Sequence, residues 1–196
     1  MPISTKVHDF LTRSSWIRKM FEEGDRLRAI HGAANVYDFT LGNPDLEPPE
    51  EFKTRLRELA NNPVPGMHKY MSNAGYPETR KAVAAHLNRE TGLKLTENNV
   101  IMTVGAGGGL NVVLKAMLNP GDEVIVSAPY FVEYGFYTDN HQGKLVVVNS
   151  RPDFQLDLEA IEQAITPKTK GILINSPNNP TGVVYTATTL KGLAEV

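Results

Sequence analysis

The chain has 196 residues, of which 41% are hydrophobic and 21% charged, and its formal net charge is -2. This composition is typical of a globular protein, and the small net charge gives no electrostatic reason to expect nucleic acid or a membrane surface as a partner. The chain contains no cysteine, which excludes disulfides, thiolate metal sites and a cysteine nucleophile. The first residues lack the apolar run of a signal peptide, so we expect a cytoplasmic protein that binds no metal.

The first hundred residues carry apolar side chains mainly at helical spacing. Prolines near the predicted helix starts fit this interpretation, since a proline in the first turn removes a donor that has no partner there. The pattern predicts three helices, over 15–31, 48–59 and 77–90. It also predicts a short strand over 36–40 and a loop rich in proline and glycine over 61–75.

From residue 100 onward, short strands rich in β-branched residues alternate with helices. The predicted strands cover 100–104, 123–127, 144–149 and 170–175, and the predicted helices cover 108–118, 131–140, 156–165 and the residues from 190. This alternation predicts an α/β fold with a mostly parallel sheet and helices on both of its faces. In such sheets ligands bind beyond the carboxyl ends of the strands. The rule selects three loops, over 105–109, 128–130 and 176–182.

The first of these loops has the sequence Gly105-Ala106-Gly107-Gly108-Gly109. Glycines let a backbone approach a ligand closely, and the start of a helix offers free N–H groups to an anion, so a phosphate is the expected ligand. A tight turn with glycines for packing is the alternative. Leu110 stands where a dinucleotide-binding fingerprint requires glycine or alanine, and no Gly-Lys-Ser/Thr follows as in a nucleoside-triphosphate loop.

The other two loops carry amides and aromatic rings. Asn178 and Asn179 place amide donors just past a predicted strand, although a proline-rich turn whose asparagines cap their own backbone is an equal alternative. Tyr130 and Phe131 follow another strand. One of these rings can stack on a flat ligand, whereas packing in the core is the commoner fate of such a pair.

Five short stretches occur in the order found in one enzyme family, the class I pyridoxal-phosphate-dependent aminotransferases. They are Gly42-Asn43-Pro44; Tyr70 with Gly75-Tyr76-Pro77-Glu78-Thr79-Arg80; the glycine loop; Asn119-Pro120-Gly121-Asp122-Glu123 with Ala128-Pro129-Tyr130; and Asn179-Pro180-Thr181-Gly182. Together they make the chain resemble the amino-terminal half of an aspartate aminotransferase-like enzyme of fold type I. The resemblance implies pyridoxal 5'-phosphate as cofactor, amino acid and 2-oxo acid substrates, and a homodimer in the full-length form.

The resemblance also implies roles for single residues on the anionic groups. The backbone N–H of Gly42 would meet the substrate carboxylate. Tyr70 would reach across a dimer interface to the cofactor phosphate of the other subunit. Ala106 and Gly107 occupy the family's phosphate-binding turn, which in this chain lacks the Ser, Thr or Lys that many relatives place there. Backbone N–H groups would then carry more of the phosphate binding.

Two further residues correspond to those that hold the cofactor ring. Phe131 matches the aromatic residue that stacks on the pyridine ring, with Tyr130 one place away as the alternative. Asn179 matches the asparagine that hydrogen-bonds the phenolic oxygen of the cofactor. A donor to that oxygen would favour its anionic form.

The resemblance implies a chain about twice this long, in which residues 1–45 form an amino-terminal arm and part of a small domain. Residues 46–196 would form the first part of the cofactor-binding large domain. The lysine that bonds to the cofactor, the aspartate that pairs with the pyridine nitrogen and the arginine that clamps the substrate carboxylate would all come later. Lys168, Lys170 and Lys191 do not resemble the catalytic lysine, and we expect them to be solvated.

The predicted function is therefore the transfer of an amino group between an amino acid and a 2-oxo acid, with this chain inactive by itself. A lyase, racemase or synthase on the same scaffold is an alternative, since fold alone does not fix the reaction. A non-catalytic cofactor-binding domain and the vestigial product of a truncated gene remain as further alternatives.

Overall fold

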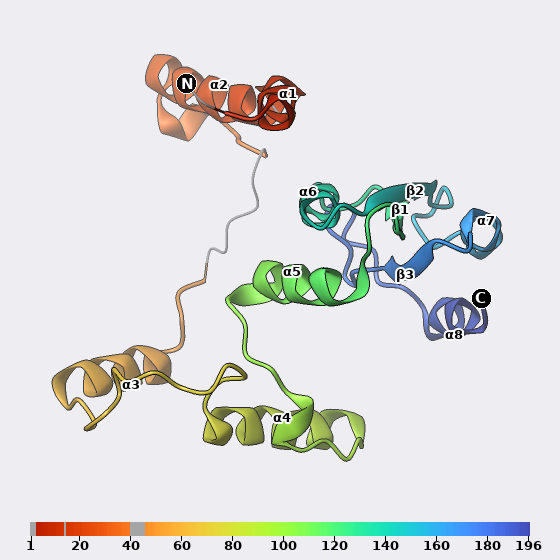
Figure 1. Cartoon of the computed structure of the whole chain (residues 1–196). Helices are drawn as coiled ribbons and strands as arrows, with labels where there is room; N and C mark the ends of the chain where they lie inside the picture. Colours follow the sequence, from red (N-terminus) through yellow and green to blue (C-terminus); the bar gives the residue numbers. More distant parts are fainter. Residues whose placement is uncertain (1–2, 14, 40–45) are drawn as a thin grey trace. The chain divides into compact units, whose positions relative to one another are not determined.

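The structure is a computed structural model that describes residues 3–13, 15–39 and 46–196, and its contacts divide the chain into two units, Met1–Lys69 and Tyr70–Val196 (Figure 1). The first unit holds the helices α1 (Thr5–Arg13), α2 (Ser15–His31) and α3 (Glu50–Asn61) and the 3-10 turn η1 (Ala33–Asn35). The predicted domains over 1–45 and 46–196 stay a prediction. Within the described ranges, no helix has both the length and the apolar character needed to cross a membrane.

The three predicted helices of the first hundred residues are confirmed with nearly the expected bounds. α2 spans 15–31 as predicted, and α3 begins one residue after Pro49, which stands at its N-cap. α4 (Pro77–Thr91) begins at a proline and ends at Gly92, which has a φ of 72°. Only glycine adopts this left-handed conformation without a steric cost, so Gly92 stops the helix.

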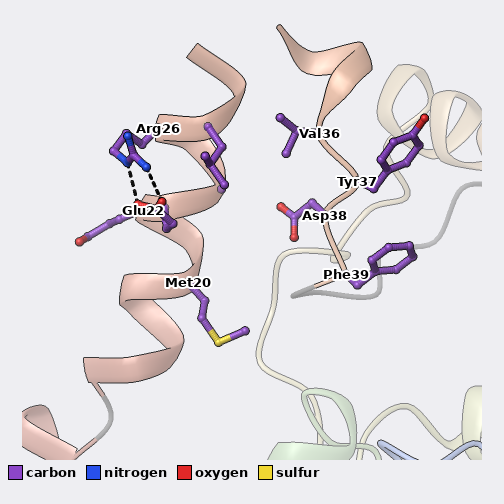
Figure 2. A pocket seen from close by; sticks show the side chains of 10 residues that line it. Met20, Glu22, Arg26, Val36, Tyr37, Asp38 and Phe39 are labelled. Carbon is purple, nitrogen blue, oxygen red and sulfur yellow. Dashed lines mark hydrogen bonds and ion pairs between the residues drawn. The ribbon is translucent and has the colours of Figure 1, made fainter. Parts of the chain in front are cut away.

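The predicted strand over 36–40 is extended over its described residues, 36–39, but it pairs with no other strand in the part of the chain that the structure describes. Val36 and Asp38 point toward α2 and are half-buried, whereas Tyr37 and Phe39 point away and are 82% and 92% exposed (Figure 2). This alternation is the period of two that predicts a strand. A strand also needs backbone partners, and here the described residues supply none.

The predicted strand over 100–104 is wrong, because these residues form no ladder. They follow the 3-10 turn η2 (Glu97–Asn99), which Thr96 caps. The N–H of Met102 donates to the carbonyl oxygen of Ala74 at 2.9 Å, but the side chain of Val104 is 95% exposed. β-branched residues favour an extended backbone, and they do not make a strand without a neighbouring strand to bond.

The predicted parallel sheet is confirmed in the second unit. It consists of β1 (Glu123–Ala128), β2 (Lys144–Asn149) and β3 (Thr169–Leu173), all parallel and in the order β2-β1-β3. β1 lies in the middle, and its residues Glu123 to Ser127 are buried. The run of apolar side chains in β1 fits a strand covered on both faces.

One face of the sheet packs against α7 (Leu158–Ala164) and α8 (Ala187–Glu195). The buried cluster on this face consists of Ile125, Val148, Leu156, Ile161 and Tyr185. Ile161 comes from α7, and the side chain of Leu193 from α8 packs against the cluster. This cluster is the main core of the second unit.

The opposite face, to which Val124 belongs, packs against α5 (Gly105–Met117) and α6 (Glu133–Asn140). A Cβ built on Gly171, which pairs with Val124, would lie 3.6 Å from Cε of Met117 in α5. A Cβ built on Gly135 in α6 would lie 3.9 Å from Cδ2 of Leu145, the other partner of Val124. Helices therefore cover both faces, as the alternating pattern predicts (Figure 1).

Glu123 begins β1 with a side chain that is 10% exposed. Its carboxylate accepts a hydrogen bond from Oγ1 of Thr166 at 2.7 Å, and Nζ of Lys144 lies 3.4 Å from its other oxygen. The Thr166 hydrogen bond, with smaller contributions from Lys144 and Lys168, holds the pKa of Glu123 below its ordinary value, although burial acts in the opposite direction.

This carboxylate should make the stability of the chain depend on pH in the acid range. Because the pKa is lower in the folded state than in the unfolded state, its stabilising contribution is complete above the ordinary glutamate pKa of about 4.3. The contribution is lost as the pH falls through the folded-state pKa. The free energy of unfolding should therefore fall less in Glu123→Gln than in the wild type when the pH is lowered from about 7 to about 3. Urea denaturation of both proteins at the two pH values measures this difference. Equal losses in the two proteins would contradict this role.

Candidate functional site

The start of α5 lies at the carboxyl edge of the sheet, beside the loop that follows β1. Gly107 of α5 lies next to Tyr137 of α6, and Oδ1 of Asn111 lies 3.3 Å from Nε2 of His141 just past the end of α6. In both contacts the residue at or after α6 lies thirty positions further along the chain than its partner in α5, so α5 and α6 run in the same direction. Because α6 begins directly after the carboxyl end of β1, the first turn of α5 lies at that edge as well.

The loop over 174–182 is tied to the same edge by Asn178. This side chain is 8% exposed, and its Nδ2 donates to the carbonyl oxygen of Pro129 at 3.1 Å and to Oγ1 of Thr181 at 2.9 Å. The backbone N–H of Asn178 donates to the carbonyl oxygen of Val183 at 2.8 Å. Asn178 thus holds two site loops together, and the sequence did not separate this role from that of Asn179.

Asn179 is placed differently from its neighbour. Its backbone N–H donates to Oδ1 of Asn175 at 2.7 Å, which fixes the position of the residue in the loop. Its side chain is exposed and makes no hydrogen bond to any residue that the structure describes. The amide of Asn179 is therefore available to a ligand.

α5 begins at Gly105, three residues earlier than predicted, so the glycine loop forms the first turn of the helix. Gly105 has a φ of 66°, a conformation that favours glycine. The N–H groups of Gly105 and Gly108 donate to the carbonyl oxygens of Thr103 and Val104. Those of Ala106 and Gly107 have no acceptor among the described residues.

Two N–H groups without an acceptor at a helix start are typical of an anion-binding site, because the helix dipole places partial positive charge at this end. The sequence predicts Ala106 and Gly107 as phosphate-binding residues; the structure places both in the first turn of α5, and their phosphate binding stays a prediction. The donors are backbone groups, so they need no side chain at either position.

The two aromatic candidates, Tyr130 and Phe131, follow β1 and are both half-buried. The ring of Phe131 packs edge-to-face against Tyr134, with 5.5 Å between centroids and 81° between planes. Phe131 therefore has a defined orientation beside the site loops. Which of the two rings stacks on a ligand stays open.

The remaining two predicted residues lie outside this cluster. Tyr70 is the first residue of the second unit, and its side chain is fully exposed. Its predicted contact with a second subunit stays a prediction. Gly42, predicted to meet the substrate carboxylate, lies outside the described residues.

A separate cavity of about 670 Å³ lies in the first unit, between α2 and residues 36–39 (Figure 2). Apolar side chains such as Met20 and Leu27 line it together with the ion-paired Glu23 and Arg26. The residues implied to bind the cofactor are absent from its lining. The candidate site is therefore the cluster at the carboxyl edge of the sheet.

Comparisons with known proteins identify the family. A sequence profile described as "Aminotransferase class I and II" matches residues 34–196. The aspartate/prephenate aminotransferase of Thermus thermophilus is 42% identical over 159 residues, which cover 80% of this chain and 40% of that protein. The aspartate/prephenate aminotransferase of Cereibacter sphaeroides is 42% identical over 166 residues, covering 83% and 40%.

A solved structure of an amino transferase from Eubacterium rectale superimposes with a TM-score of 0.93 at 37% identity, covering 100% of this chain and 50% of that one. The chain thus spans about two fifths of the length of the two curated relatives. The matched profile covers most of this chain and includes every residue of the site cluster. The chain belongs to the class I and II aminotransferases, a family of pyridoxal-phosphate-dependent enzymes.

Proposed function

We propose that this chain holds the phosphate and the phenolic oxygen of pyridoxal 5'-phosphate in an enzyme that transfers an amino group between an amino acid and a 2-oxo acid. The observation that carries the proposal is the pair of N–H groups, on Ala106 and Gly107, that lack an acceptor at the start of α5. A phosphate ester needs such donors. The uncommitted amide of Asn179 offers a donor of the kind that a phenolic oxygen needs.

The residues of the chain would bind and orient the cofactor, which itself supplies an electron sink for the reacting carbon of the amino acid. The N–H groups of Ala106 and Gly107 would fix the phosphate. Nδ2 of Asn179 would donate to the phenolic oxygen and favour its anionic form. Phe131 would cover one face of the ring and exclude water from it without adding charge.

We also propose that none of the lysines of this chain bonds covalently to the cofactor, so that the chain alone is inactive. The charges of Lys168 and Lys170 help to lower the pKa of Asp122, although the hydrogen bond from the N–H of Asn119 lowers it more. Lys168 directly precedes β3, and Lys170 is its second residue. That is the amino end of the sheet, opposite to the site. Lys191 is exposed on α8.

Two proposals concern the complete enzyme. The exposed ring of Tyr70 would reach the cofactor phosphate of a second subunit, which makes a homodimer the expected assembly. The backbone N–H of Gly42 would meet the substrate carboxylate. Both rest on the resemblance of the residues around them to the family's motifs.

Ala106→Pro tests the phosphate site, because proline lacks the N–H and is tolerated in a first helical turn. The variant should bind pyridoxal phosphate about tenfold more weakly than the wild type, while its affinity for pyridoxal, which lacks the phosphate, stays the same. Ala187→Pro makes the same change at the start of α8 and serves as the matched control. Affinities can be measured by absorbance titration of the 196-residue chain.

The same samples test the lysine proposal by borohydride reduction followed by intact mass measurement. A weak, scattered background of adducts is expected. A single stoichiometric cofactor adduct would show that a lysine of this chain bonds to the cofactor. An equal affinity of the wild type for pyridoxal phosphate and pyridoxal would instead count against the phosphate site.

A further inference from the structure

The phenolic oxygen of Tyr137 lies against the backbone of Gly107 in the first turn of α5. A Cβ built on Gly107 would lie 2.9 Å from Oη of Tyr137 and 3.4 Å from its Cζ. The first distance is shorter than real Cβ contacts allow. The end of the tyrosine ring therefore occupies the space that a side chain at residue 107 would fill, and a glycine at 107 leaves room for it.

Tyr137 is half-buried, and its hydroxyl makes no hydrogen bond to any residue in the described part of the chain. Other polar side chains near the first turn of α5 are already engaged. Nδ2 of Asn111 donates to the carbonyl oxygen of Gly107 at 2.9 Å, and Oγ1 of Thr103 donates to that of Gly105 at 3.0 Å. A tyrosine hydroxyl that is removed from water normally finds a partner. Here it lies against Gly107, whose N–H, like that of Ala106, also lacks one.

We propose that Tyr137 completes the anion site of α5 by donating a hydrogen bond from its hydroxyl to the anion that the N–H groups of Ala106 and Gly107 bind. The helix α6 thus supplies, from the side, the polar contact that a glycine at 107 cannot make. This inference rests on the proposed function, in which the anion is the phosphate of pyridoxal phosphate. It adds a side-chain donor to a site that otherwise consists of backbone groups.

Tyr137→Phe is the direct test, because it removes one oxygen atom and keeps the ring. The dissociation constant for pyridoxal phosphate should rise about tenfold, and that for pyridoxal should not change. Tyr76→Phe is the matched control, since Tyr76 lies in the same unit, at the N-cap of α4. A merely structural role of Tyr137 would weaken the binding of both ligands alike.

A second variant moves the hydroxyl to the other helix. In Tyr137→Phe the nearest atom to a Cβ at 107 would be Cζ, at 3.4 Å, so Gly107→Ser can be added without the close contact to Oη. The double variant should regain part of the preference for pyridoxal phosphate over pyridoxal. A further loss on adding the serine would contradict the proposal.

The outcomes separate this inference from the proposed function. If Ala106→Pro weakens the binding of pyridoxal phosphate but Tyr137→Phe does not, the anion site stands and Tyr137 has no part in it. If the wild type shows no preference for the phosphorylated ligand, the proposed function fails and this inference fails with it. Circular dichroism of Tyr137→Phe should match that of the wild type, because the lost oxygen has no protein partner in the described residues.

Discussion

Replacing Ile125 by alanine should lower the free energy of unfolding of the chain by about 2–5 kcal/mol. Ile125 is fully buried in the middle strand of the sheet, in one cluster with Val148 and Ile161. The change removes buried methyl and methylene groups and leaves a cavity. Strands on both sides and the helix α7 hold the walls of that cavity in place, so the site cannot easily collapse. Urea denaturation followed by circular dichroism measures the loss.

Ile101→Ala is the matched control for this change. Ile101 lies in the same unit, but its side chain is 65% exposed and it belongs to no strand. The same deletion of atoms should change the free energy of unfolding there by less than about 0.5 kcal/mol. Comparable losses at the two positions would mean that the buried cluster does not carry the stability of the second unit.

The sheet of the second unit could be predicted from the sequence because its strands are short, β-branched runs bounded by turn residues. β1, β2 and β3 differ from the predicted strands by at most two residues at either end. The parallel arrangement follows from the helices between the strands, which need a crossover connection. Local pattern and long-range pairing agree in this part of the chain.

The segments over 36–40 and 100–104 have the same local pattern, yet neither forms a strand in the described residues. The difference lies in what surrounds them. A ladder requires a second strand at hydrogen-bonding distance, and the spacing of apolar residues in one segment carries no information about such a partner. Val36 to Phe39 keep the alternation of a strand without the hydrogen bonds.

The start of α5 also shows a limit of local rules. Glycines usually indicate a turn, so the sequence places the helix start at Gly108, whereas the helix begins at Gly105. Gly105 has a positive φ, but Gly107 and Gly108 have ordinary helical backbone. The reason for a glycine at 107 lies thirty residues further on, in Tyr137, and a contact of that range cannot be read from the glycine loop itself.

The pair Asn178-Asn179 offers the sharpest test of the site, because the two residues are chemically identical and structurally opposite. Asn178 is buried and donates to Pro129 and Thr181, whereas the side chain of Asn179 is exposed and uncommitted. Asn178→Ala should lower the free energy of unfolding by about 1–3 kcal/mol, since it leaves a cavity and an unpaired carbonyl oxygen on Pro129. It should also weaken cofactor binding, because both site loops lose their connection.

Asn179→Ala should have the opposite profile. Its free energy of unfolding should stay within about 0.5 kcal/mol of the wild-type value, since no intramolecular hydrogen bond of the side chain is lost. The dissociation constant for pyridoxal phosphate should rise about tenfold, as expected for the loss of one donor to a partly charged oxygen. Denaturation and cofactor titration of the two variants, side by side, separate the residue that builds the site from the residue that binds in it. If Asn179→Ala were the destabilising change and Asn178→Ala the neutral one, the assignment of the two amides would have to be exchanged.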